Sequence, residues 1–159
     1  MDFLWSPWRY DYLASGAKRP PTCVFCIADD PSQDAERLVA YRGVHNFIIL
    51  NLFPYTSGHV MIAPYEHLNT IALAKPEQML EMMQLAQTLL GALQKLYSPE
   101  GFNIGMNLGQ AAGAGIREHF HLHVVPRWVG DSNFTTVISE TRVLPEDLSR
   151  TYERLRSVL

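Results

Sequence analysis

The run His119-Phe120-His121-Leu122-His123-Val124-Val125 constrains this chain more than any other stretch, because imidazole and apolar side chains alternate along it. In a β-strand, successive side chains point to opposite faces of the sheet. The run therefore predicts a strand that presents three imidazoles on one face. On the other face, Phe120, Leu122 and Val124 would fill the core and fix the register of the strand.

Imidazole titrates near neutrality, so a neutral histidine can attack phosphorus while a protonated one supplies positive charge and a proton. The segment just before the strand, residues 107–115, holds almost only small or amide-bearing residues, which let backbone N–H groups approach phosphate oxygens. The alternative for the histidine run is a set of core or tag-like histidines. The alternative for residues 107–115 is a flexible loop. The adjacency of the two features favours a site that binds an anion.

The rest of the chain predicts an α+β fold. Short β-rich runs separated by Gly43, Pro54 and Gly58 indicate antiparallel strands joined by turns. From Pro76 to Tyr97, apolar residues recur at three- and four-residue steps, which predicts one long helix. We expect an antiparallel sheet of about five strands, with this helix across it and a C-terminal helix within 144–159. The expected strands are 38–41, 46–50, 60–63, 102–108 and 119–126.

Composition sets further bounds. A chain of 159 residues with 47% hydrophobic residues suits one core, so we expect a single domain over 1–159, with an aromatic and proline-rich arm at 1–22 that docks on the body or on a partner subunit. A net charge of −3 disfavours nucleic acid as a partner. Without a leader-like start or an apolar run of about 18 residues, the chain is expected in the cytoplasm, away from membranes.

The order of these motifs resembles the histidine triad (HIT) superfamily. The similarity runs from 23 to 126 and includes Cys23-Val24-Phe25-Cys26-Ile27, Phe47 to Asn51, Gly58 to Pro64 with His67, and Asn107 before the histidine run. The arm from Trp5 to Tyr10 and the segment from Pro126 to Phe134 are most similar to a bacterial branch that includes diadenosine tetraphosphate phosphorylases. This resemblance implies a HIT core over 23–126, with a C-terminal loop and helix over 127–159.

The resemblance also implies roles for individual residues. His121 would be the nucleophile that forms a nucleotidyl-histidine intermediate, with its other ring nitrogen held by a backbone carbonyl, and His123 would bind phosphoryl oxygens. Asn51 would contact the ribose of a purine nucleotide. The phosphate would be contacted by Asn107, Gly113, Ala114 and Gly115, and the base by Phe25, Ile27 and Phe47. Phe47 equally fits a place in the core. Members of this family commonly form homodimers.

Cys23 and Cys26 supply two thiolates at a spacing common in tetrahedral zinc sites, but two ligands do not close such a site. The resemblance implies that His67 and His119 complete it, and a closed Cys2His2 site would be structural. A bare thiol pair and a redox pair are the alternatives, of which the second lacks a thioredoxin-like βαβ context. His45 and His59 receive no role.

The sequence thus predicts a nucleotidyl hydrolase or transferase that cleaves dinucleoside polyphosphates resembling diadenosine tetraphosphate, with water or phosphate as the final acceptor. A purine nucleoside phosphoramidate hydrolase is the alternative enzyme. From another class, the alternative is a zinc-stabilised nucleotide-binding protein without turnover. Gly115-Ile116 stands where several relatives carry a hydroxyl or amide that assists the leaving group, so the source of that proton stays open.

Overall fold

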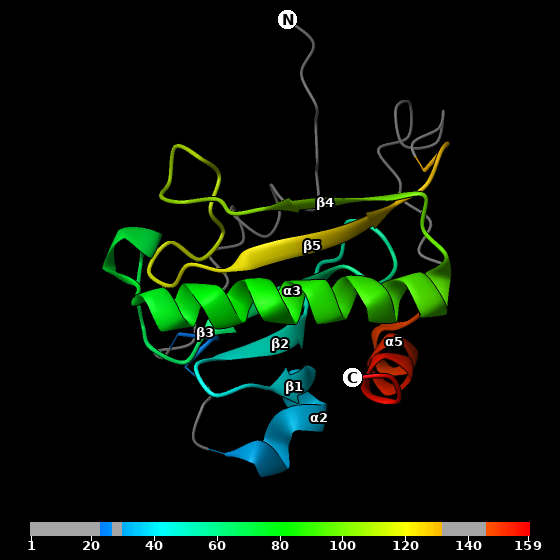
Figure 1. Cartoon of the computed structure of the whole chain (residues 1–159), viewed down its shortest axis with the longest axis horizontal. Coiled ribbons are helices and arrows are strands. Elements are labelled where there is room, and N and C mark those ends of the chain that lie inside the picture. The colour runs from blue at the N-terminus through cyan, green and yellow to red at the C-terminus, as the bar shows by residue number, and fades with distance from the viewer. Residues whose placement is uncertain (1–22, 27–29, 132–145) are drawn as a thin grey trace, which may run out of the picture.

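The fold is built on one antiparallel β-sheet. The computed structural model describes residues 23–26, 30–131 and 146–159, and Figure 1 shows its layers. Antiparallel strands form a five-stranded sheet in the order β1-β2-β3-β5-β4. The strands are β1 (Val39–Arg42), β2 (Asn46–Leu50), β3 (Val60–Pro64), β4 (Gly101–Gly105) and β5 (Leu122–Arg127). The predicted α+β class and strand number are confirmed.

One long helix, α3 (Pro76–Tyr97), lies across one face of the sheet with the bounds that the sequence predicts. Its first turn is fixed by Gln78, whose side-chain oxygen accepts the N–H of Lys75 at 2.7 Å. It ends at Ser98, whose φ of 46° is left-handed.

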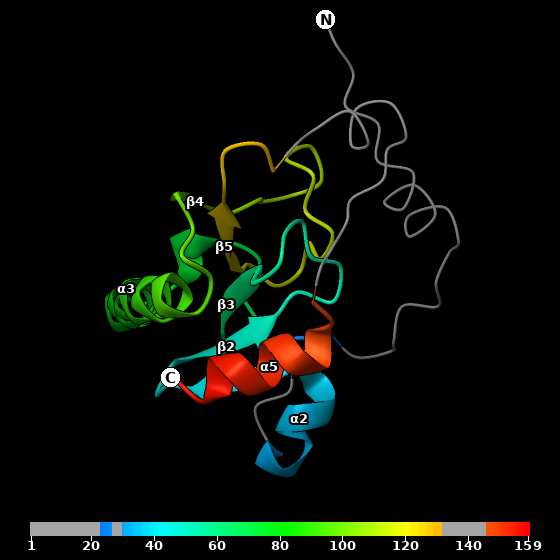
Figure 2. The ribbon, with the colours of Figure 1, turned by 90° about the vertical axis from the view of Figure 1, so that its right-hand side faces the viewer.

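The C-terminal helix α5 (Leu148–Arg156) packs beside α3 and β1 (Figure 2). Shorter helical turns are η1 (Pro31–Gln33), α2 (Asp34–Arg37) and η2 (Ile71–Leu73). In the described part of the chain, no helix has the length and apolarity needed to cross a membrane.

The main core lies between α3, α5 and the sheet. From β5 and the residues just before it, Phe120, Leu122 and Val124 turn to this side, as the alternation predicts. They meet fully buried residues of α3, among them Met82 and Leu89. This apolar packing holds the histidine-bearing strand in its register, because a shift by one residue would exchange the two faces.

The histidine strand is shorter than predicted, since β5 begins at Leu122 and not at His119. Its antiparallel partner β3 explains this. Ile62 pairs with Leu122, so the same register continued by two residues would set Pro64 opposite Phe120. Proline has no N–H to donate, and the ladder stops there. The N–H of Phe120 instead donates to the carbonyl of Leu68 at 2.7 Å.

The turn between β1 and β2 is tied to α3 by one carboxylate. Glu81 accepts hydrogen bonds from the backbone N–H groups of Val44, His45 and Asn46 at 2.6, 2.7 and 2.8 Å, and from the Asn46 side chain at 2.8 Å. Burial opposes the charge of Glu81, but these donors outweigh it and hold its pKa below 4.5. The turn is therefore anchored by a charged group at the edge of the core.

Candidate active site

His121 is held in one tautomer by the backbone. Its Nδ1 lies 3.0 Å from the carbonyl oxygen of His119, and because a carbonyl only accepts, Nδ1 carries the proton. The lone pair is then on Nε2. His121 is only 5% exposed, and burial lowers its pKa, which keeps the ring neutral at pH 7. A neutral imidazole with a lone pair on Nε2 is a competent nucleophile toward phosphorus.

His123 is held by a second imidazole, which sequence reasoning left without a role. The backbone N–H of Tyr55 donates to Nδ1 of His59 at 3.0 Å, so the proton of neutral His59 sits on Nε2. That Nε2 lies 3.0 Å from Nδ1 of His123 and donates to it. His123 then carries its own proton on Nε2, from which it can donate to a phosphoryl oxygen. His59 is 2% exposed, so the donor that holds the ring of His123 is buried.

The last two imidazoles of the run stand side by side, with the ring centroids of His121 and His123 4.8 Å apart. Phe25 also packs against His121 at 4.8 Å between centroids, and it meets His119 in a T-shaped contact at 5.4 Å. Phe25 and Phe47 are 1% and 0% exposed and belong to a small core cluster on this face. The assignment of these two rings to a base pocket stays a prediction, and Ile27 lies outside the described residues.

Asn51 lies beside the same group of imidazoles. Its Oδ1 accepts the N–H of Phe53 at 3.0 Å, and its Nδ2 lies 3.3 Å from Nδ1 of His59. Because that Nδ1 already accepts the shorter bond from Tyr55, we assign the Asn51 contact to packing beside the ring. The contact of Asn51 with a ribose stays a prediction.

The glycine-rich loop before the strand is closed by its own backbone. Gly109 and Gly113 have φ of 79° and 81°, the left-handed region that favours glycine. The N–H of Gly113 donates to Gln110, and that of Ala114 donates to Gly109. Among the described residues, the N–H of Gly115 has no hydrogen-bond partner. Gly115 is thus the predicted anion donor whose N–H remains available in this structure.

A cavity of about 360 Å³ begins at His123 and Asn107. The imidazole of His123 and the side-chain amide of Asn107, which is predicted to bind phosphate, thus line the same cavity. The remaining lining residues are Tyr55, Thr56, Asn103, Ile104, Gly105, Met106, Val125, Arg127 and Asp131. The sequence offered no indication of this cavity, because it depends on how β4 pairs with β5.

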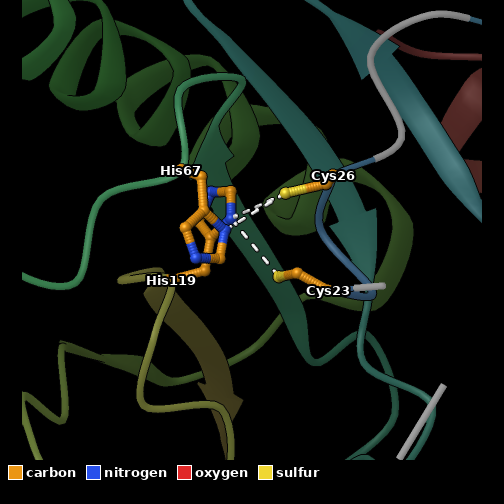
Figure 3. Close-up of side chains that lie close together, drawn as sticks. All are labelled: Cys23, Cys26, His67 and His119. Carbon is orange, nitrogen blue, oxygen red and sulfur yellow. Dashed lines mark hydrogen bonds between the residues drawn. The ribbon is translucent and has the colours of Figure 1, made fainter. Parts of the chain in front are cut away.

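The four predicted metal ligands meet in space although they come from three separate segments (Figure 3). Nδ1 of His119 lies 3.5 Å from Sγ of Cys23 and 3.8 Å from Sγ of Cys26, and Nδ1 of His67 lies 3.2 Å from Sγ of Cys26. Sulfur and nitrogen ligands of a tetrahedral zinc ion would lie about 3.3–3.8 Å apart, given the usual bond lengths. Cys23, Cys26, His67 and His119 can therefore hold a metal ion.

The tautomer of His119 fits this use. Its Nε2 lies 2.8 Å from the carbonyl oxygen of Pro64 and must donate to it, which leaves the lone pair on Nδ1, facing the thiols. Burial lowers the pKa of His119 to about 4, so the ring is neutral at pH 7. A neutral imidazole and two thiol groups form the donor set that zinc prefers.

These observations define the class of protein. The sequence matches the HIT domain family over residues 32–129, and the chain belongs to that family, which confirms the resemblance given by its motifs. Among its relatives is the AP-4-A phosphorylase of Mycobacterium tuberculosis, 38% identical over 154 residues that cover 93% of this chain and 79% of the relative.

Solved structures agree with this assignment. A zinc-bound histidine triad family protein from Mycobacterium smegmatis has a TM-score of 0.66 and 30% identity, over 86% of this chain and 92% of the other. The diadenosine triphosphate hydrolase of Plasmodium falciparum in complex with Cyclomarin A has a TM-score of 0.61 at 16% identity, over 77% of this chain and 74% of the other. At that identity, the second likeness shows the fold alone.

Proposed function

We propose that this protein is a nucleotidyltransferase that cleaves dinucleoside polyphosphates through a covalent intermediate on His121. The observation that carries the proposal is the pair of fixed tautomers, with a lone pair on Nε2 of His121 and a proton on Nε2 of His123. Adjacent imidazoles in these two forms supply a nucleophile and a hydrogen-bond donor for the same phosphoryl group. The similarity to an AP-4-A phosphorylase supports the substrate class.

The reaction has two displacements. In the first, the Nε2 lone pair of His121 attacks the α-phosphorus, an N–P bond forms, and the P–O bond to the leaving nucleotide breaks with its electrons on that oxygen. In the second, an oxygen of phosphate or water attacks the same phosphorus, and the N–P bond breaks to regenerate His121. His123, Asn107 and the N–H of Gly115 stabilise charge on the equatorial oxygens, where positioned donors contribute most.

The remaining contacts of the substrate follow the motif positions. Gly113 and Ala114 shape the loop that presents Gly115, Asn51 holds the ribose, and Phe25 and Phe47 border the base. Phosphate is the proposed acceptor, a choice supported by the relative from Mycobacterium tuberculosis, which is an AP-4-A phosphorylase. With phosphate as acceptor, diadenosine tetraphosphate would give ADP and ATP, whereas water would give AMP and ATP.

We further propose that zinc is the metal of the Cys23, Cys26, His67 and His119 site. Its role is structural, because a site closed by four protein ligands leaves no position for water or substrate. Zinc would fix the position of His119, whose carbonyl sets the tautomer of His121. Two thiol ligands require a reducing environment, which supports a cytoplasmic location.

Metal content and thermal unfolding test the zinc site. Protein purified without added metal is expected to hold about one zinc ion per chain, and Cys26→Ser to hold far less and unfold at a lower temperature. His45→Ala is the matched control, since the side chain of His45 belongs to no described site. Equal zinc content in wild type and Cys26→Ser would rule out this ligand set.

A homodimer is the proposed assembly. β4 is an edge strand of the sheet, and its residues Asn103, Ile104 and Gly105 are exposed. On the outer face of α3, Leu80 and Met83 are 62% and 48% exposed. An unpaired strand edge and exposed apolar side chains are common features of pairing surfaces. A monomer by light scattering at micromolar concentration would overturn this part. The aromatic arm at 1–22, which the sequence places against the body or a partner, lies outside the described residues.

Product analysis tests the proposed reaction. Incubation with diadenosine tetraphosphate, with and without inorganic phosphate, is followed by chromatography for wild type and His121→Ala. Phosphate-dependent ADP plus ATP, absent in the variant, is the expected result. AMP plus ATP regardless of phosphate would make the enzyme a hydrolase. If wild type gives no turnover, a nucleoside phosphoramidate is the next substrate to test, and saturable binding without any turnover would indicate a nucleotide-binding protein.

A further inference from the structure

The cavity beside His123 extends well beyond the two groups that the proposed reaction uses. From His123 and Asn107 it continues to Arg127 and Asp131, and its volume of about 360 Å³ lies within the range of small-molecule sites. The chemistry at phosphorus uses only the end of the cavity formed by His123 and Asn107. The remainder of the cavity is therefore available for another part of the substrate.

The register between β4 and β5 explains why this space is open. Gly105 pairs with His123, Asn103 with Val125, and Gly101 with Arg127. By the alternation along β5, these residues share the face that carries His121. A Cβ atom added at Gly105 or at Gly101 would meet no heavy atom within 4 Å. Of these two glycines, Gly105 lines the cavity, and it leaves the cavity floor uncovered beside His123.

The direction of the cavity matches the direction in which the leaving group departs. Along an extended chain, the Cα atoms of His121 and His123 are roughly 7 Å apart. Arg127 lies four residues beyond His123, in the direction away from His121. In an in-line displacement the leaving group exits on the side of phosphorus opposite the attacking nitrogen. We propose that this cavity is the subsite for the outer nucleoside of a dinucleoside polyphosphate, an inference that rests on the proposed function.

The charges at the far end favour a neutral nucleoside over further phosphate. Nη2 of Arg127 lies 2.8 Å from Oδ1 of Asp131, and Nη1 of Arg127 lies 2.6 Å from Oδ1 of Asn103. The two charged side chains that line the cavity therefore form one ion pair, and their charges compensate each other. Val125 adds apolar surface suited to a base.

Two substrates with the same first half isolate the outer nucleoside. Diadenosine tetraphosphate and adenosine 5′-tetraphosphate share one adenosine and the phosphate chain, and only the first has a second nucleoside. The measured quantity is the ratio of their kcat/KM values, which does not depend on the amount of folded protein. Gly105→Leu fills the cavity floor, Asn103→Ala removes the amide at its far end, and Gly91→Leu adds the same side chain to an open glycine on α3 as control.

The wild-type ratio is expected to exceed about ten in favour of diadenosine tetraphosphate, and both cavity variants to lower it by roughly tenfold, whereas Gly91→Leu keeps it. A wild-type ratio near one would overturn the subsite. A ratio in both cavity variants equal to that of Gly91→Leu would overturn it as well. If wild type cleaves neither compound, the proposed function itself fails, so the two failures are distinguishable.

Discussion

The two faces of the sheet are built from the same strands and differ in what holds them together. Under α3, the side chains are apolar and are held by packing, with Leu122 and Val124 in the main core. On the opposite face, the imidazoles of His121 and His123 are held by hydrogen bonds to a backbone carbonyl and to His59. The first face supplies stability, and the second supplies ring nitrogens in defined protonation states.

The protonation states of the histidine face are set by the backbone. Each tautomer on the histidine face traces back to a backbone group, namely the carbonyls of His119 and Pro64 and the N–H of Tyr55. These backbone groups are positioned by the sheet and its loops, which the apolar face keeps in register. Apart from the metal site, changes on the histidine face should therefore affect turnover, and changes on the apolar face should affect stability.

His121→Ala makes the sharpest test of that division. Turnover is expected to fall at least about thousandfold, because the attacking nitrogen is lost and water cannot replace it at the same position. The variant should still unfold cooperatively, since the main core lies on the other face. Residual activity within tenfold of wild type, measured from initial rates, would contradict the assignment of His121.

Leu122→Ala changes the neighbouring residue and should have the opposite effect. Leu122 is 4% exposed within the main core, so the loss of its side chain leaves a cavity and should lower the free energy of unfolding by about 2–5 kcal/mol. Urea unfolding measures this change. Below the unfolding transition, the variant should keep most of its turnover; a loss as large as that of His121→Ala would break the separation of the two faces.

His59→Phe tests whether a buried residue that does not touch the substrate sets the state of His123. Removing the donor to Nδ1 of His123 should lower kcat by roughly ten- to a hundredfold, the usual effect of losing an outer partner that orients a functional histidine. The pH profile of kcat should change as well, which a purely structural effect would not produce. His59→Gln, whose amide can still donate, should recover part of the loss. Identical pH profiles in wild type and His59→Phe would remove the positioning role.

Glu81→Gln should have the smallest effect, at the edge of the apolar face. The carboxylate accepts four hydrogen bonds, and its loss should cost about 1–3 kcal/mol of stability at pH 7. Because the folded pKa of Glu81 lies below 4.5, its stabilisation is complete above that pH and declines as the pH falls through the folded value. The difference between wild type and variant in urea unfolding should shrink accordingly, and a difference independent of pH would contradict this account.

Much of the fold follows from the sequence because its patterns are local. Helix α3 was predicted at both ends, since Pro76 begins it and the break after Tyr97 stops it. The strand ends were less predictable, because they depend on partners. β5 begins three residues later than predicted, because Pro64 on the neighbouring strand interrupts the pairing. Leu38, expected within β1, instead has a left-handed φ of 61° after α2.

The site divides in the same way. The resemblance to the HIT family implied the metal ligands and the backbone-held tautomer of His121, and the structure brings Cys23, Cys26, His67 and His119 together. The role of His59 was missed, because its contact with His123 spans 64 residues and depends on the pairing of β3 with β5. The cavity floor was missed for the same reason, since isolated glycines in a strand carry no signal of what they face.

Covalent capture tests the central claim most directly. The protein is mixed with diadenosine tetraphosphate without phosphate, quenched in alkali within the first turnover, and analysed by intact mass and peptide mapping, with His121→Ala alongside. The account predicts one adenylyl group on His121 that is lost in acid and is absent from the variant. Turnover by wild type without any adduct, or an adduct on another residue, would contradict it.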